Sequence, residues 1–469
     1  MRSNIPLPCL EDYDVSAITG FLPHEVPLQR LTNPYYAQWE EIAAAVPSLL
    51  LTRRIRSVVD AKLKLLSCEY LGSKAEWRRA YSVLGFIAHA YIWSVGDSTN
   101  KLPAQIARPF LETAEKLDLP AVATYAGLCL WNYKLIFNDE ESLEHLDLDN
   151  ITTINTFTGS IDESWFYLVS VYFEYKGAPC IVKGLDAIQY AREGNIAKVV
   201  ETLQSLAEAI DELGSVLMRM EEMCDPHVFY FKIRPYLAGW KNMESVGLKN
   251  GVYYGDEVEP RLYAGGSNAQ SSLIQTLDLI LNVEHFGTGD SKGHDQNAFM
   301  SEMRSYMPGA HKRFLEHLSK VNIIKEFVTE NAPQNPELVL SYDACIAMLK
   351  AFRDKHIQIV TRYIILQSQK SKTMGSDTTK TIRSGLAKST HKKEDMRGTG
   401  GTALLPFLKQ CRDETGDAAA GRWGRRILTG ALTSKPSRSA MLESEFEDTK
   451  IGMAGSWKDD RSNVREGHW

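Results

Sequence analysis

The sequence predicts an all-α protein, and three observations support this fold class. Good helix formers dominate long segments, apolar residues in these segments recur every three or four positions, and runs with the alternating pattern of a strand are sparse. The clearest helices are expected at residues 36–46, 76–93, 196–213 and 272–281. The runs 165–175 and 228–236 are ambiguous, because their aromatic and β-branched residues fit a buried strand and a wholly buried helix equally well.

Two polar segments interrupt this helical pattern. Residues 368–397 are rich in Ser, Thr, Lys and Gly, so they cannot bury enough apolar surface to offset the entropy cost of ordering. We expect a mobile loop there, either a lid over a pocket or a surface insertion without function. Residues 413–469 show little pattern, so we expect a disordered tail, with an inaccurately predicted gene end as the competing explanation.

Charge and cysteine usage exclude several classes of protein. The 53 Lys and Arg residues are outnumbered by 59 Asp and Glu residues, so there is no basic excess for binding nucleic acid. The seven cysteines are odd in number and never in C-x-x-C spacing, which argues against a disulfide scaffold, a zinc ribbon and covalently attached haem. The chain start lacks the apolar core of a signal peptide, and no apolar run is long enough to span a bilayer. We therefore expect a cytoplasmic protein that binds neither nucleic acid nor membrane.

A single histidine, His356, lies within an apolar helical face. The face consists of Leu349, Phe352, His356, Ile359, Val360 and Tyr363, whose spacing places their side chains on one side of a helix. The imidazole therefore points inward, without a second His or Cys at metal-ligand spacing. On spacing alone, a buried histidine satisfied by backbone carbonyls is the simpler interpretation. Haem is the alternative, because it brings four nitrogens of its own and needs as little as one proximal histidine.

Several further motifs accompany this histidine. They are Leu119-Pro120, Tyr125, Tyr263-Ala264-Gly265-Gly266-Ser267, Met303-Arg304-Ser305-Tyr306-Met307-Pro308, Tyr342-Asp343-Ala344-Cys345, His356 to Ile364, and Gly398-Thr399-Gly400-Gly401-Thr402. Together they resemble the indoleamine 2,3-dioxygenase family over nearly the whole stretch from Asp12 to Thr415. The resemblance favours helix for both ambiguous runs. We expect a two-domain helical fold, with a small N-terminal domain over 1–157 and a larger domain over 158–412 that contains a haem pocket.

The resemblance also implies a function. Members of the family use haem b and O₂ to cleave the indole C2–C3 bond of L-tryptophan or a related indoleamine, giving N-formylkynurenine for the kynurenine pathway and NAD synthesis. His356 would hold the haem iron, and an electron donor would keep that iron ferrous. Two alternatives stay open: a haem-binding or sensing paralogue with little turnover, and a helical interaction protein without haem.

Phe166 and Ser170 are four residues apart and therefore share one helical face. The resemblance implies that this face covers the distal side of the haem, with Phe166 packed on the indole and Ser170 near bound oxygen, and we take both as catalytic candidates. Without the family, a serine in an apolar helix is expected to bond back to a carbonyl one turn earlier. Neither 165–175 nor 228–236 contains a histidine that could act as a distal base.

Arg234 follows an aromatic cluster that begins at Phe229. A guanidinium matches a carboxylate in two-point fashion, and an amino-acid substrate supplies one. An internal salt bridge is the alternative for any arginine. The resemblance assigns Arg234 to the substrate carboxylate and Phe229 to the pocket wall.

Two glycine-rich stretches, 264–267 and 398–402, lack the lysine of a phosphate-binding loop and the setting of a dinucleotide fingerprint. Glycine also permits close backbone approach to a flat ligand. The resemblance implies that Gly266 and Ser267 line the site for substrate and haem, and that Thr399 closes over the amino-acid end of the substrate. Tyr125 is the remaining substrate-binding candidate.

Some positions depart from the family pattern. Asn268-Ala269 stands where Ala-Gly is common, which puts substrate affinity in doubt, and Leu128 stands where a cysteine is frequent. Asp278 fits a position that the family keeps acidic, and we expect it to help orient the proximal side. We interpret His311, which also fits a family histidine, as structural.

Overall fold

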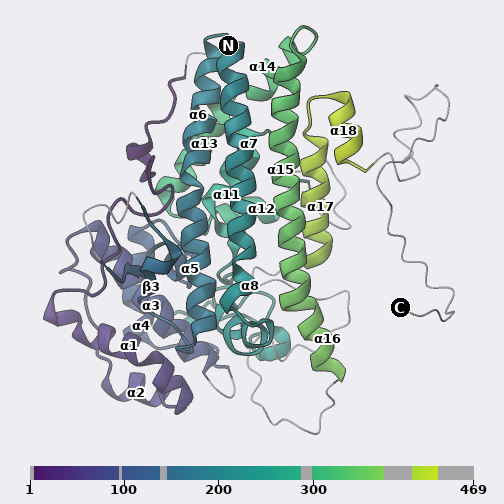
Figure 1. Cartoon of the computed structure of the whole chain (residues 1–469). Coiled ribbons are helices and arrows are strands. Elements are labelled where there is room, and N and C mark those ends of the chain that lie inside the picture. The colour runs from purple at the N-terminus through teal and green to yellow at the C-terminus, as the bar shows by residue number, and fades with distance from the viewer. Residues whose placement is uncertain (1–4, 95–97, 138–144, 287–297, 374–403, 431–469) are drawn as a thin grey trace, which may run out of the picture.

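The structure is a computed structural model that describes residues 5–94, 98–137, 145–286, 298–373 and 404–430. Long helices run side by side through most of its length, and shorter helices gather at one end (Figure 1). Strands in the described residues form only two short pairs. The pair β1 (Lys101–Leu102) and β4 (Tyr253–Tyr254) is parallel, whereas β2 (Tyr133–Leu135) and β3 (Ile151–Thr153) are antiparallel. The predicted all-α class is confirmed.

The first four helices lie together at the lower end in Figure 1. They are α1 (Ala37–Leu51), α2 (Ile55–Lys62), α3 (Lys74–Trp93) and α4 (Ala104–Lys116). Helix α3 is central to this group, because nearly all of its side chains from Arg79 to Trp93 are buried. It begins with a capping box in which Ser73 and Glu76 satisfy each other's backbone N–H groups.

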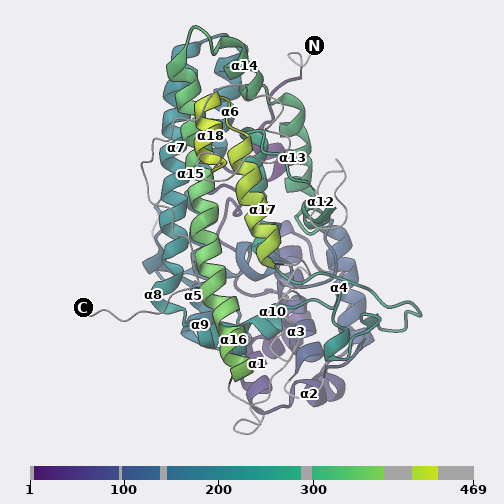
Figure 2. The ribbon, with the colours of Figure 1, turned by 90° about the vertical axis from the view of Figure 1, so that its right-hand side faces the viewer.

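The long helices form the other part of the molecule. They are α5 (Ile161–Lys176), α6 (Ala178–Arg192), α7 (Ile196–Met218) and α15 (Pro336–Val360), with α11 (Ser272–Ile280), α13 (Gly309–Val321) and α17 (Leu404–Asp417) packed beside them. Figure 2 shows α17 lying along α15. The remaining short helices are α8 (Met220–Met223), α9 (Pro226–Val228), α10 (Arg234–Leu237), α12 (Ala298–Arg304), α14 (Ile324–Asn331), α16 (Leu366–Thr373) and α18 (Arg422–Leu428).

The predicted helices are confirmed, since the four clearest segments lie within α1, α3, α7 and α11 except for one end residue each at Tyr36 and Leu281. Both ambiguous runs are helical as well. Residues 165–175 lie within α5, and 228–236 pass from α9 through a π-helical turn, Phe229–Ile233, into α10. Two further π turns, Ala126–Leu130 and Thr361–Ile365, occur in the described chain.

The expected disorder of 413–469 is wrong for its first part. Helix α17 continues to Asp417, and α18 follows at Arg422–Leu428. The buried side chains of Ala418 and Ala419 join the core, and the carboxylate of Asp343 accepts hydrogen bonds from the backbone N–H groups of Ala420 (2.7 Å) and Gly421 (3.1 Å). Such bonds satisfy backbone donors at the start of a helix. Residues 431–469 lie outside the described residues.

The expected loop over 368–397 begins within a helix, because α16 includes residues 368–373 and Ser368 is buried. Residues 374–397 lie outside the described residues. None of the helices that the structure describes combines the length and the apolar character needed to cross a bilayer. The domain boundary near residue 157 stays a prediction.

Candidate functional site

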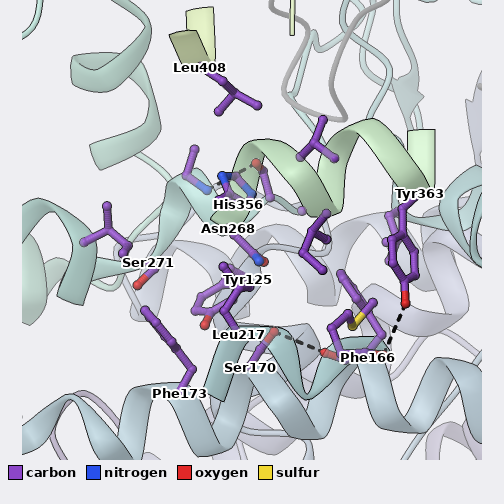
Figure 3. Close-up of a pocket in the computed structure, with 18 of the residues that line it drawn as sticks. Tyr125, Phe166, Ser170, Phe173, Leu217, Asn268, Ser271, His356, Tyr363 and Leu408 are labelled. Atoms are coloured by element: carbon purple, nitrogen blue, oxygen red, sulfur yellow. Dashed lines mark hydrogen bonds between the residues drawn. The ribbon is translucent and has the colours of Figure 1, made fainter. Parts of the chain in front are cut away.

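One large cavity opens between α5, α15, α17 and the loop that contains Gly266 (Figure 3). Its volume is about 240 Å³, many times the roughly 10 to 15 Å³ that a single ordered water needs. Most of the lining side chains are aromatic or aliphatic. The cavity is therefore suited to a large organic group with few polar contacts.

All three π turns of the described chain contribute to this cavity. They supply Leu128 and Cys129, Phe229, and the pair Tyr363 and Ile364. A π turn inserts an extra residue into a helix and redirects the side chains around it, and such turns are frequent at functional sites. The local backbone thus departs from regular helix where the cavity wall is built.

His356 reaches the cavity from α15 (Figure 3). Burial disfavours its charged form and the neighbouring Arg353 repels a proton, so the pKa of the imidazole falls to about 4. The ring is therefore neutral at physiological pH and has a nitrogen lone pair for a metal ion.

The wall formed by α5 carries Phe166 and Ser170 one turn apart, as their spacing predicts. The Ser170 hydroxyl donates a hydrogen bond to the carbonyl of Phe166 at 3.2 Å, the local bond expected of a serine in an apolar helix. The ring of Phe166 packs against Phe229 at 4.9 Å between centroids, and Phe229 contacts Tyr363 at 5.8 Å. These three rings form an aromatic wall.

Arg234 is 4% exposed and lines the cavity from α10. Its guanidinium carbon lies 5.3 Å from the ring centroid of Tyr230, and burial lowers its pKa. An arginine stays charged in proteins, so the side chain brings a positive charge to a wall that is otherwise mostly apolar. A guanidinium at this position can bind an anionic ligand group.

Gly266 and Ser267 also line the cavity, beside Asn268. A Cβ atom added at Gly266 would lie 2.5 Å from Cδ1 of Leu128 and 3.1 Å from the carbonyl oxygen of Ala123, so a larger residue does not fit there. The three residues that depart from the family pattern, Leu128, Asn268 and Ala269, are all part of the lining.

Tyr125 belongs to a buried polar network that the sequence did not reveal. Its hydroxyl donates to Oε1 of Glu174 at 3.0 Å, and the hydroxyl of Ser271 donates to the same oxygen at 2.6 Å. Burial raises the pKa of Glu174 to about 7 despite these two donors. The sequence feature that could have pointed to Glu174 is its position one helical turn after Ser170 in a largely apolar helix.

A second buried network lies on the side of His356. Asp278 forms an ion pair with Arg353, which is three residues before His356 on α15, and its other oxygen is 3.1 Å from Nε2 of His285. Burial alone would raise the pKa of Asp278, but Arg353 and His285 outweigh burial and lower it to about 2. Arg353 lines the cavity, so Asp278 contacts a cavity residue without lining the cavity itself. Its orienting role stays a prediction.

Eight predicted site residues, far apart in the sequence, line this one cavity. They are Tyr125, Phe166, Ser170, Phe229, Arg234, Gly266, Ser267 and His356. Thr399 lies outside the described residues. His311 is buried against Phe21, with 4.8 Å between ring centroids, and does not line the cavity.

Comparison with known proteins shows what the chain is similar to. A sequence model of the family described as "Indoleamine 2,3-dioxygenase" matches residues 9–418. The indoleamine 2,3-dioxygenase of Saccharomyces cerevisiae is 50% identical over 427 residues, which cover 87% of this chain and 93% of the yeast protein.

More distant relatives cover the chain to a similar extent. The 6-hydroxytryptophan 2,3-dioxygenase of Fusarium equiseti is 35% identical over 407 residues, covering 86% of this chain and 96% of that protein. Indoleamine 2,3-dioxygenase 2 of Mus musculus is 35% identical over 425 residues, covering 89% and 97%. The range matched by the family model, residues 9–418, contains all eight positions named above.

Proposed function

This chain belongs to the indoleamine 2,3-dioxygenase family, and from that membership we propose how its cavity performs the reaction. The chain is an oxidoreductase that cleaves the indole C2–C3 bond of a tryptophan-type substrate with O₂ to give N-formylkynurenine. We assign haem b to the cavity and His356 to its iron. The observation that supports this assignment is the position of His356 on the wall of a large, mostly apolar cavity that Arg234 also lines.

The residues that line the cavity fit a haem in their chemistry. His356 is the single histidine among the described residues that line the cavity, and one axial histidine is enough because the porphyrin supplies four nitrogens. Gly266 also lines the cavity, and its close approach to Leu128 leaves no room for a side chain at that position. When bound, the haem iron supplies the activation of O₂.

The side chains of this protein position the substrate. The rings of Phe166, Phe229 and Tyr363 offer flat apolar contact for an indole, and the buried guanidinium of Arg234 offers two-point binding to the carboxylate. Apolar walls exclude water from the reacting atoms. Because no histidine stands on the α5 wall, orientation contributes more to this reaction than proton transfer by the protein.

The electron balance of the reaction determines whether the protein needs an electron donor. Both oxygen atoms of O₂ enter N-formylkynurenine, so turnover consumes no net electrons. An electron donor is needed only to bring the iron to its ferrous state. We further propose a cytoplasmic location and a role in the kynurenine pathway and NAD synthesis. The seven free cysteines are in keeping with a reducing compartment.

A product assay tests this function. Haem-loaded protein is incubated with L-tryptophan in air under reducing conditions, and N-formylkynurenine is measured by absorbance and mass spectrometry. Product formation that requires haem is expected. Normal haem uptake with no product would instead favour a second candidate, a haem-binding paralogue with little turnover, for which the polar Asn268 in the cavity lining is the motivating observation.

A further inference from the structure

We propose that His285, Cys411 and Glu414 form a second metal site, for a divalent transition metal ion of the zinc type. The ligand atoms of these three side chains all lie within 4.8 Å of one another. Cys411 is buried, and the side chains of His285 and Glu414 are 6% and 11% exposed. The site does not include His356, although Cys411 lines the same large cavity, and the proposal does not depend on the dioxygenase reaction.

The backbone brings the three proposed metal ligands close together. Cys411 and Glu414 are three residues apart on α17 and therefore share one face of that helix. His285 follows α11 and lies with its Nδ1 atom 2.7 Å from Oε2 of Glu414. The other oxygen of Glu414 accepts hydrogen bonds from the backbone N–H of Phe286 (3.1 Å) and from the side chain of Gln410 (2.6 Å). Glu414 is thus held with Oε2 toward the imidazole.

The other ring nitrogen of His285, Nε2, lies beside a carboxylate, as is usual for a histidine that binds a metal ion. Nε2 of His285 lies 3.1 Å from Oδ2 of Asp278, and Asp278 is itself paired with Arg353. A carboxylate that accepts the Nε2 proton fixes the tautomer in which Nδ1 is the metal ligand. Asp278 is therefore a positioning residue for this site.

The donor set selects the class of ion. One imidazole, one thiolate and one carboxylate suit zinc and similar ions, whereas calcium and magnesium prefer oxygen alone. In tetrahedral zinc geometry the donors stand about 3.3 to 3.6 Å apart. The Nδ1 to Oε2 separation must open slightly and Cys411 must move inward. A divalent ion replaces the proton between His285 and Glu414 and the thiol proton of Cys411, so the net charge of the cluster is unchanged.

Such an ion would fix one wall of the large cavity. Phe407, Leu408 and Cys411 of α17 all line that cavity, and His285 belongs to the segment after α11. A bound ion would join these two segments through short bonds. We therefore expect the metal to stabilise the position of α17 against the rest of the fold.

The test uses the haem-loaded full chain with zinc added in equimolar amount and then desalted. Metal content by mass spectrometry should give one zinc per chain, and zinc-edge X-ray absorption should show one sulfur at about 2.3 Å. C411S should remove the sulfur signal and weaken zinc binding by at least about tenfold. H227Q, which removes an exposed histidine elsewhere, is the matched control and should bind as the wild type does.

Two results would overturn the proposal: wild-type protein that retains no zinc, or C411S protein that retains as much zinc as the wild type. If C411S does not fold, E414Q gives the same comparison through the zinc-induced rise in Tm, which the wild type should show and E414Q should lack. None of these measurements uses dioxygenase activity, so they stand whether or not the product assay succeeds.

Discussion

Two ionisable side chains near the cavity, Arg234 and Glu174, are held where water cannot easily reach them. Arg234 stood out in the sequence because a permanent charge followed an aromatic cluster. Glu174 did not, because its partners Tyr125 and Ser271 are 49 and 97 residues away in the chain. Sequence patterns identify residues with unusual local surroundings. They miss residues whose surroundings arise only when distant segments pack together.

Arg234→Lys tests substrate binding at this scale. Lysine keeps the charge but loses the planar fork that binds a carboxylate at two points. We expect KM for L-tryptophan to rise by a factor equivalent to roughly 1.5 to 3 kcal/mol, with a smaller change in kcat. Steady-state kinetics with haem-loaded protein measure both constants. A KM equal to that of the wild type would remove Arg234 from the substrate site.

Glu174→Gln tests the ionisation of the buried carboxyl. The folded-state pKa of Glu174 is about 7, above its ordinary value of 4.5, so the folded protein holds a proton that the unfolded chain releases. This bound proton stabilises the folded protein. Its contribution to the free energy of unfolding is fully present below about pH 4.5 and is lost as pH rises through 7. Glutamine keeps the acceptor for Tyr125 and Ser271 without the titration.

The free energy of unfolding by urea, measured at pH 5 and pH 8, gives the comparison. Relative to the wild type, E174Q should gain up to roughly 3 kcal/mol at the higher pH. If the free energies of unfolding of the two proteins differ by the same amount at pH 5 and at pH 8, Glu174 does not titrate in this range.

At the scale of elements, the sequence predicted α1, α3, α7 and α11 but left α5 and residues 228–236 open. Helix α5 packs against α6 and α7 and also against β3, so it has no polar face from which a period can be read. The family resemblance, rather than the pattern, correctly favoured helix for it. Helix α18 was missed because its own composition is polar. It is attached through Asp343, 77 residues before Ala420.

Asp343→Ala tests how α18 is attached. Loss of the carboxylate leaves the N–H groups of Ala420 and Gly421 without this acceptor, at a cost of about 0.5 to 2 kcal/mol. Hydrogen exchange at residues 418–428 should therefore become faster, while exchange in α7 stays unchanged. D343N retains an acceptor and serves as the control. Unchanged exchange in D343A would mean that the burial of Ala418 and Ala419 alone holds the segment.

At the scale of the whole molecule, the cavity lies where two hydrophobic clusters meet. One cluster includes Tyr125, Phe229 and Tyr363, and the other includes Phe173 with Phe352 packed against it. All five residues line the cavity. Of these residues, the family resemblance predicted Tyr125 and Phe229, and helical spacing placed Phe352 and Tyr363 on the face of His356. Nothing in the sequence pointed to Phe173, because no local pattern tells which distant segments share a pocket. Ligand sites are common at such junctions.

The function proposed for this chain depends most directly on His356 as the residue that holds haem in this cavity. The measurement is the visible spectrum of wild-type and H356A protein after haem reconstitution and gel filtration, with circular dichroism to verify that both are folded. The wild type should retain haem with a Soret band, and folded H356A should lose most of it. Folded H356A with the haem content of the wild type would contradict the assignment.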